Sequence, residues 1–202
     1  PMESSRPRAL LVNPPVYDFA LFDLFLKPYG LLRVAEWLRK AGWEITIINC
    51  LDYYDRESEH LYGKPHRNPN GTGKFFKQEI PKPSRLAPIP RRFSRYGIAP
   101  EVLEERIRKA APDVIFLTSG MTYWYMGLKE VCSLLRTSYP HTPIIMGGVY
   151  ASLMPQHCRA VIGPDYLITG EGLPELQEIL SVLHFPVYPH PQEEPLVSTE
   201  MW

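Results

Sequence analysis

Short apolar runs that alternate with helical patterns are the feature that most constrains the fold of this chain. Five such runs occur, at residues 9–12, 45–48, 114–117, 144–146 and 166–168. Apart from Thr46 these runs are continuously apolar, and short runs of this kind are typical of strands buried on both faces of a sheet. Five segments with apolar residues at helical spacing alternate with them. The sequence therefore predicts, for residues 1–184, an α/β fold with a five-stranded, doubly wound parallel sheet.

The number of strands and their connections favour one strand order. Consecutive parallel strands joined by helices are connected by right-handed crossovers. For five strands we expect the flavodoxin-like order 2-1-3-4-5, in which the direction of winding reverses between strands 1 and 3. A ligand of such a sheet binds at the carboxyl ends of the strands that flank this reversal.

Two segments lack the alternating pattern. Residues 53–99, after the second predicted strand, contain ten Lys or Arg and four Asp or Glu, a net charge of +6. Because the whole chain is neutral, the remainder carries −6. We expect residues 53–99 to form a long irregular insertion. Residues 185–202 contain four prolines and no periodicity, and we expect a linker or tail there.

Composition argues against several classes of function. The 22 Lys and Arg balance 22 Asp and Glu, so no general attraction to nucleic acid or to a membrane surface is expected. No apolar run approaches the roughly 18 residues that cross a bilayer. The three cysteines are widely spaced, which indicates neither a disulfide framework nor a zinc ribbon and favours a reducing, cytoplasmic setting. No G-x-G-x-x-G follows the first strand, which argues against a dinucleotide site.

The segments that follow four of the predicted strands share small, hydroxyl-bearing and proline residues. The carboxyl ends of parallel strands meet at one edge of a sheet, glycines allow a ligand to approach the backbone, and hydroxyls donate or accept hydrogen bonds. Gly and Pro also end strands in general, but the convergence of four such loops favours a site for a large, flat, neutral-to-polar ligand. The candidate binding residues are Asn13, Pro14, Pro15, Tyr17, Ser119, Gly120, Met121, Thr122, Gly147, Gly148, Val149, Tyr150, Gly170, Glu171 and Gly172.

An ordered set of these segments resembles the cobalamin-binding domain at the N-terminus of radical SAM enzymes. The resemblance extends from about residue 9 to residue 183, without the insertion. Its pieces are Asn-Pro-Pro at 13–15, Gly-Leu-Leu-x-x-Ala-x-x-Leu from 30, Gly-Trp-Glu-Ile from 42, Pro-Asp-Val-Ile-Phe-Leu-Thr-Ser from 112, Gly-Gly-x-x-Ala-Ser-Leu-x-Pro from 147 and Asp-Tyr-Leu-Ile-Thr-Gly-Glu-Gly from 165.

The resemblance implies a flavodoxin-like fold that carries a corrinoid across the strand ends, with its nucleotide tail in a slot beside the sheet. Residues 119–121 resemble the S-x-L element of cobalamin-binding domains, and Gly147-Gly148 resembles the paired glycines that line the tail slot. The D-x-H-x-x-G element is absent, because no histidine lies between residues 13 and 30. The resemblance therefore implies base-off binding without a histidine ligand. The nearby aromatic residues either cover the lower face of the corrinoid or form a docking surface: Tyr17, Phe19, Phe22 and Phe25.

A second departure concerns the catalytic part of the family. The C-x-x-x-C-x-x-C signature of radical SAM enzymes is missing, since Cys50, Cys132 and Cys158 do not have that spacing. We therefore expect a module that is not catalytic alone. By resemblance, its parent is a methyltransferase-like enzyme whose C-terminal radical SAM domain, the expected protein partner, holds a 4Fe–4S cluster and S-adenosylmethionine.

Two other functions remain open. The first is a degenerate domain that binds no cobalamin and serves as a structural module or as a module for binding a substrate or a partner. The missing histidine and the long insertion motivate it. The second is a flavin-binding relative of flavodoxin.

Overall fold

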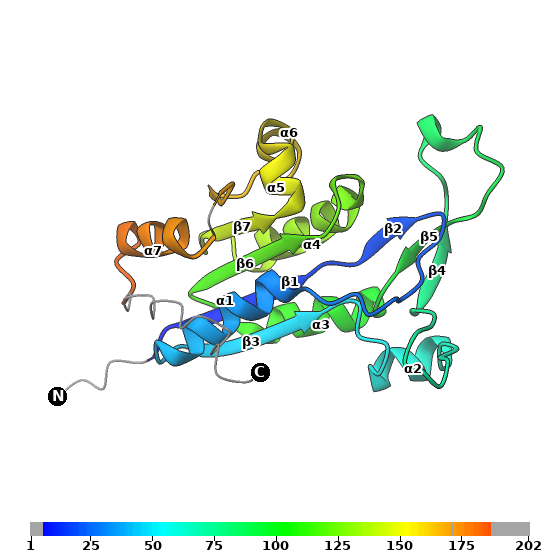
Figure 1. The fold of residues 1–202 in the computed structure, drawn as a ribbon, viewed down its shortest axis with the longest axis horizontal. Helices are drawn as coiled ribbons and strands as arrows, with labels where there is room; N and C mark the ends of the chain where they lie inside the picture. Colours follow the sequence, from blue (N-terminus) through cyan, green and yellow to red (C-terminus); the bar gives the residue numbers. More distant parts are fainter. Residues whose placement is uncertain (1–5, 171, 187–202) are drawn as a thin grey trace, which may run out of the picture.

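A five-stranded parallel sheet forms the centre of the molecule (Figure 1). The computed structural model describes residues 6–170 and 172–186. All neighbouring strands of this sheet are parallel, so the predicted α/β fold with a parallel five-stranded sheet is confirmed. When the five strands of this sheet are numbered in chain order, their observed spatial order is 2-1-3-4-5. The strands in spatial order are β3 (Glu44–Asn49), β1 (Arg8–Asn13), β6 (Val114–Ser119), β7 (Ile144–Gly148) and β8 (Tyr166–Leu167).

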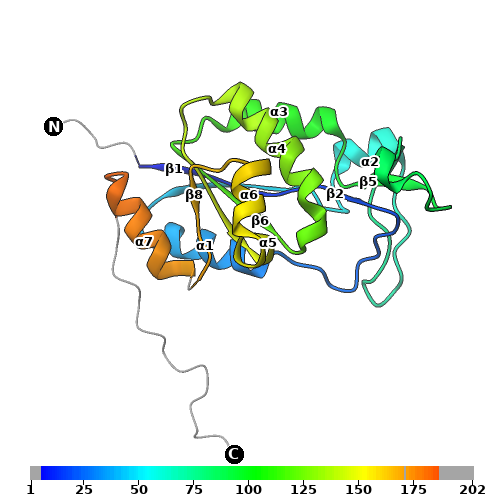
Figure 2. The same ribbon diagram turned by 90° about the horizontal axis from the view of Figure 1, so that it is seen from above.

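Helices cover both faces of this sheet (Figure 2). One face carries α1 (Tyr29–Lys40) and α7 (Gly172–Val182). The other carries α3 (Pro100–Ala110) and α4 (Tyr125–Ser138). The short helices α5 (Val149–Leu153) and α6 (Pro155–Val161) contribute Tyr150 and Cys158 to the core on the α3 and α4 side.

The alternation of side chains along each strand divides the core into two layers. In β1, Leu10 and Val12 point toward α3 and α4, whereas Ala9 and Leu11 point toward α1 and α7. In β7, Ile145 lies on the α1 and α7 side. The helices meet the sheet through apolar stripes at helical spacing, such as Leu31, Ala35 and Leu38 of α1.

The prediction of an irregular insertion at residues 53–99 is wrong. This segment contains α2 (Arg56–Tyr62), β4 (Lys77–Ile80), the 3₁₀ turn η1 (Ser84–Leu86) and β5 (Phe93–Tyr96). Both strands belong to a second, antiparallel sheet of order β2-β5-β4, in which β2 (Val16–Asp18) comes from the loop after β1. The second sheet lies beyond the end of β1 (Figure 1).

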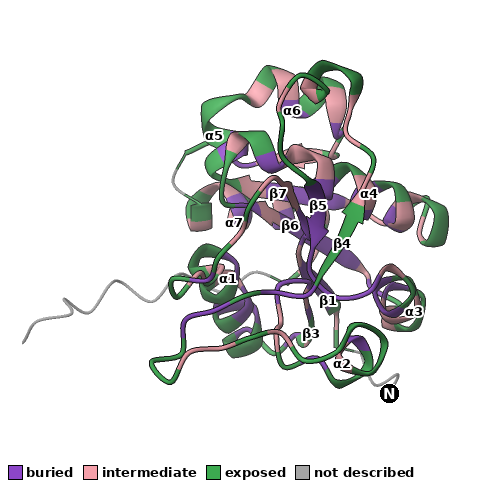
Figure 3. Ribbon diagram, turned by 90° about the vertical axis from the view of Figure 1, so that its right-hand side faces the viewer, coloured by how far each residue is buried: buried purple, intermediate pink, exposed green. Residues whose placement is uncertain are grey.

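The second sheet is not evident from the sequence pattern, because its strands are short and mix polar with apolar residues. β5 is buried along its whole length, whereas β4 beside it is almost entirely exposed (Figure 3). The buried residues of β5 include Ser94 and Arg95, which are polar. A strand of four residues with a buried arginine gives no alternating apolar signal.

Ion pairs and hydrogen bonds fasten the insertion to the main domain. Asp55 accepts a hydrogen bond from the Ser58 amide at the start of α2 (2.8 Å) and forms an ion pair with Arg106 of α3. Within the insertion, the amide of Ala99, the residue just before α3, donates to Ser58 Oγ at 2.9 Å. Arg95 of β5 forms an ion pair with Glu130 of α4 at 2.9 Å. The insertion is therefore an ordered extension of the domain.

The predicted linker or tail, residues 185–202, lies outside the described residues except for its first two. Phe185 packs on Trp43, with 5.1 Å between the ring centroids. None of the helices in the described part of the chain combines the length and the apolarity needed to cross a bilayer.

Candidate functional site

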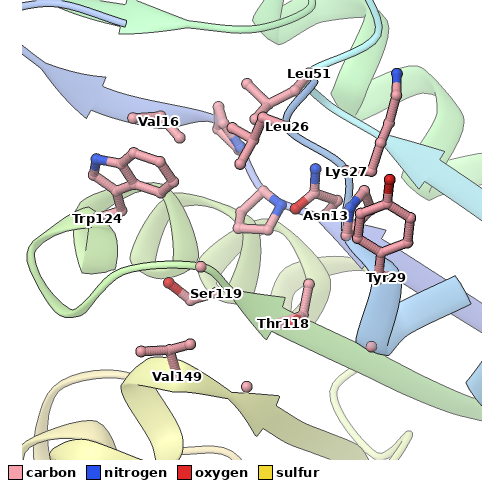
Figure 4. A pocket seen from close by; sticks show the side chains of 16 residues that line it. Asn13, Val16, Leu26, Lys27, Tyr29, Leu51, Thr118, Ser119, Trp124 and Val149 are labelled. Atoms are coloured by element: carbon pink, nitrogen blue, oxygen red, sulfur yellow. The ribbon is translucent and has the colours of Figure 1, made fainter. Parts of the chain in front are cut away.

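A cavity opens at the carboxyl ends of β1 and β6, where the direction of winding reverses (Figure 4). We call it the edge cavity; its volume is about 340 Å³. Trp124 and Tyr29 lie on opposite sides of it, as do Val149 and Leu26 (Figure 4). Open α/β sheets bind their ligands at this position, outside the carboxyl ends of the strands.

The end of β1 and the loop after it form the floor of the edge cavity. Asn13, Pro14 and Pro15 line it. Asn13 Nδ2 donates to Asn49 Oδ1 at 2.8 Å, and the same oxygen accepts from the Leu51 amide at 3.2 Å. The Asn13 side chain is therefore held in place across the β1–β3 pair, and the floor is fixed before a ligand arrives.

The end of β6 forms one wall. Thr118, Ser119 and Gly120 line it together with Trp124. The indole Nε1 of Trp124 donates to Asp18 Oδ2 of β2 at 3.1 Å, which fixes the ring against the second sheet. Ser119 Oγ donates to the Met121 carbonyl at 2.9 Å, so this hydroxyl can still accept a hydrogen bond from a ligand.

The roof comes from the segment before and at the start of α1. We call residues 19–28 the roof loop; its Leu26, Lys27 and Pro28 line the edge cavity. Among the described residues that line the cavity, Lys27 alone is charged. Its side chain leads away from the cavity centre (Figure 4), and its ammonium lies 5.2 Å from the centroid of the Tyr53 ring. The walls are therefore nearly neutral.

A second cavity adjoins the first on the α1 and α7 face of the sheet. We call it the face cavity; its volume is about 210 Å³. It shares Gly30, Thr118 and Gly148 with the edge cavity. The other lining residues are apolar or small, apart from Ser152: Leu31, Val34, Phe116, Leu117, Ile145, Gly147, Ile168, Gly170, Gly172 and Leu176.

The two adjacent glycines after β7 have different structural roles. A β-carbon on Gly148 would lie 2.8 Å from Thr118 Oγ1 and 2.9 Å from the Ser119 carbonyl oxygen, and Gly148 has a φ of +96°. Only glycine fits there without strain. A β-carbon on Gly147 would meet only Ile168, at 3.6 Å. Gly147 therefore keeps the face cavity open, whereas Gly148 allows β7 to turn into α5.

The structure brings most of the candidate binding residues to these cavities. The edge cavity is lined by Asn13, Pro14, Pro15, Ser119, Gly120, Gly148 and Val149. The face cavity is lined by Gly147, Gly148, Gly170 and Gly172. Glu171 lies outside the described residues.

Four described candidates line neither cavity. The Tyr17 hydroxyl donates to Glu130 Oε2 at 2.7 Å; burial, with this hydrogen bond, raises the pKa of Tyr17. Tyr150 is fully buried and its hydroxyl lies 2.5 Å from Nδ1 of His157. Met121 is exposed, and Thr122 starts the 3₁₀ turn η2 (Thr122–Trp124).

The aromatic set after β1 does not act as one surface. Tyr17 and Phe19 pack on Phe93 of the second sheet, with ring centroids 6.5 and 5.1 Å apart. Phe22 and Phe25 are exposed on the roof loop. Their shared position in sequence does not predict this split, because it depends on where the chain leaves the second sheet after β2, which ends at Asp18.

Sequence reasoning missed several lining residues, among them Leu26, Lys27, Tyr29, Leu51, Thr118 and Trp124. Thr118 directly precedes the candidate residues 119–122 and Trp124 lies two residues after them, so both are close in sequence to residues that the sequence did indicate. Leu26 and Lys27 carry no periodic signal, because they belong to neither a helix nor a strand.

The cysteines offer no reactive or metal-binding group at this site. All three are buried. Burial raises the pKa of Cys50 and of Cys132, and raises that of Cys158 to about 11, so the thiols stay protonated. In the part of the chain that the structure describes, no group of three or more His, Cys, Asp or Glu side chains is placed to hold a metal ion.

Comparison with known protein families points to one ligand. The family model of the B12 binding domain matches residues 93–180, from β5 to α7. This part of the chain supplies the β6 wall, Gly148 and Val149 of the edge cavity, and the face cavity except its α1 residues. No curated protein matches the chain. The match supports a cobalamin-binding domain and agrees with the flavodoxin-like sheet.

Proposed function

We propose that this chain is a cobalamin-binding module that holds a corrinoid over the edge cavity, with the nucleotide tail of the ligand in the face cavity. One observation carries this proposal: the two cavities adjoin at the reversal point of the sheet and share Gly30, Thr118 and Gly148 in their linings. Two adjoining cavities, the larger of about 340 Å³ and the smaller of about 210 Å³, match a ligand with a large ring and a tail. The match to the B12 binding domain supports the same ligand.

The walls of the edge cavity suit a corrin ring. A corrin is broad and largely apolar, with amide side chains at its rim. The cavity offers apolar contacts from Pro14, Pro15 and Trp124, and polar groups on Asn13 and Thr118 that can bind amides. Apolar pockets with a few placed polar groups are the usual form of cofactor sites.

The face cavity suits the nucleotide tail. Its lining includes Phe116, Ile145 and Ile168, against which a flat aromatic base can pack. Gly147 supplies free volume at the level of this cavity because no β-carbon projects from it. The residues present therefore fit cobalamin, which, when bound, supplies a cobalt-carbon bond for group transfer.

We further propose that cobalamin is bound base-off and without a protein ligand to cobalt. Among the described residues that line the edge cavity, none is His, Cys or Met. The chain's own residues then bind the ring, exclude water from one of its faces and accept its displaced base. Weak ligation favours release of a methyl group. This behaviour fits a parent of the radical SAM methyltransferase type, with its 4Fe–4S cluster and S-adenosylmethionine in a domain C-terminal to this one.

One alternative function has an observation in its favour. The B12 match begins at residue 93 and leaves out β1, the roof loop and α1, which contribute the floor and roof of the edge cavity. A degenerate domain that serves a structural or partner-binding role is consistent with such a partial match.

A titration of the purified chain with hydroxocobalamin, followed by absorbance, separates these functions. The proposal predicts a saturable change to a base-off spectrum at one cobalamin per chain. Saturable binding with an unchanged base-on spectrum would overturn the binding mode. The absence of saturation at tens of micromolar would overturn cobalamin binding and favour the degenerate domain.

A further inference from the structure

A buried carboxylate lies in the roof loop of the edge cavity. Asp23 is 1% exposed. Its Oδ1 accepts a hydrogen bond from the Leu26 amide at 2.7 Å, and its Oδ2 accepts one from Arg67 Nη2 at 2.6 Å. Burying a carboxylate costs free energy unless a partner compensates for the lost water. For Asp23 that partner comes from the insertion, 44 residues away along the chain.

The Arg67 guanidinium is held on several sides. Its Cζ lies 3.5 Å from the centroid of the Tyr53 ring. Nη2 donates to the Gly71 carbonyl as well as to Asp23, and Nη1 lies 3.4 Å from the Lys74 carbonyl. A planar guanidinium can stack on a ring and donate in several directions within its plane, which a lysine ammonium cannot do.

Backbone hydrogen bonds join the same two loops. The Asp23 amide donates to the Gly73 carbonyl at 2.8 Å, and the Gly73 amide donates to the Asp23 carbonyl at 3.2 Å. A β-carbon on Gly73 would lie 2.5 Å from the His66 carbonyl oxygen and 2.8 Å from the Arg67 Cα. The loop that carries Arg67 therefore fits closely around residue 73, and its pairing with residue 23 fixes the height of the roof loop.

The contact between Asp23 and Arg67 positions the roof-loop residues that line the edge cavity. Leu26, Lys27 and Pro28 come shortly after Asp23 in the roof loop and belong to neither a helix nor a strand. Two contacts position them: the hydrogen bond from the Leu26 amide to Asp23, and the contact of the Lys27 ammonium with the Tyr53 ring. Arg67 stacks on the same ring. The position of the roof loop, and with it any contact that the loop makes to a ligand in the edge cavity, therefore depends on the insertion.

We propose that Arg67 is a positioning residue for the corrinoid site: it holds Asp23, and through Asp23 the roof loop, at the height at which Leu26 and Pro28 contact the ligand. This inference rests on the proposed function for its binding consequence, but the contact itself is testable without a ligand. It gives the insertion a role in the site without any direct contact between Arg67 and cobalamin.

The test compares Arg67→Lys and Tyr53→Leu with a matched control, Arg136→Lys. Arg136 also donates to one carboxylate, that of Asp165, and to two backbone carbonyls, those of Thr142 and Gly163. Arg136 lies in the last turn of α4 and lines neither cavity. Two quantities are measured on the full chain: hydrogen exchange at the Asp23 and Leu26 amides without ligand, by NMR, and the Kd of hydroxocobalamin, by equilibrium dialysis.

We expect Arg67→Lys to raise exchange at both amides by roughly tenfold through local opening and to weaken cobalamin binding by a factor of about ten, equivalent to 1.4 kcal/mol. Tyr53→Leu should act in the same direction. Arg136→Lys should change neither quantity even if it lowers the thermal midpoint.

Unchanged exchange in Arg67→Lys would overturn the inference, as would raised exchange with an unchanged Kd. If the wild-type chain binds no cobalamin, the proposed function fails. The exchange at Asp23 and Leu26 then decides alone whether Arg67 positions the roof loop.

Discussion

Gly127 of α4 lies directly against the carbonyl oxygen of Pro15, so closely that a β-carbon on Gly127 would overlap that oxygen. Pro15 belongs to the floor of the edge cavity. The absence of a side chain at one helical position therefore lets the loop after β1 cross over the start of α4. This close approach fixes the floor of the cavity relative to the β6 wall.

We predict that Gly127→Ala displaces Pro15 and destabilises the fold. Helix propensity alone favours alanine by up to about 1 kcal/mol, but overpacking against a backbone oxygen costs about 1–3 kcal/mol or more. The net effect should be a lower midpoint in urea unfolding, together with weaker cobalamin binding. Ser133→Ala on the exposed side of the same helix is the control. An equal or higher midpoint for Gly127→Ala would show that the loop moves freely.

A buried network links the second sheet to α4, and its removal should be costly. Arg95 Nε donates to Glu130 at 2.9 Å, Tyr17 donates to the same carboxylate, and Arg95 is 3% exposed. Glu130→Ala leaves the guanidinium buried without its partner, which typically costs about 3–5 kcal/mol.

Urea unfolding measures this loss, with Glu105→Ala as the comparison. Glu105 forms an ion pair with Lys109 on the exposed side of α3, and exposed pairs contribute little. Losses of the same size in the two variants would contradict the structural role of the Arg95–Glu130 pair.

Stability should fall at alkaline pH because burial keeps Tyr150 protonated. Desolvation raises the pKa of Tyr150 to about 12, from 10.0. Between these two values the unfolded chain loses the phenol proton while the folded chain keeps it. The free energy of unfolding therefore decreases as pH rises from about 10 to 12, by roughly 2–3 kcal/mol for this group. Below pH 10 the full contribution is present.

The variant Tyr150→Phe isolates this effect. It removes the titrating phenol, so its stability should fall less steeply between pH 10 and 12 than that of the wild type. The hydroxyl contact with His157 is lost as well, which lowers stability at neutral pH. Parallel curves for the two proteins above pH 10 would contradict the assignment.

The central strands of the main sheet, β1, β6 and β7, are predictable from sequence because each contains a continuous, buried apolar run. Leu10, Leu11 and Val12 have no exposed surface, and burial on both faces is what produces such a run. The glycines and prolines that end these runs meet at one edge for the same topological reason. Hence most of the candidate residues line the two cavities.

The second sheet and the roof loop depend on contacts that a local pattern does not contain. β2 and β5 pair across nearly eighty residues, and the buried side chain that fastens β5 is an arginine. The roof loop is positioned by Asp23 and Arg67, which are also far apart in sequence. Gly147 and Gly148 are indistinguishable in the sequence, and only the backbone geometry separates their roles.

The most direct test of the central claim is the binding of cobalamin and of cobinamide, which lacks the nucleotide tail, to wild-type and Gly147→Val chains by equilibrium dialysis. Valine at residue 147 projects into the face cavity without the strain that position 148 imposes. We predict that the wild type binds both ligands saturably, and that Gly147→Val weakens cobalamin binding at least about tenfold while its Kd for cobinamide stays unchanged. No saturable binding of cobalamin to the wild type, or equal cobalamin affinity for both chains, would contradict the account.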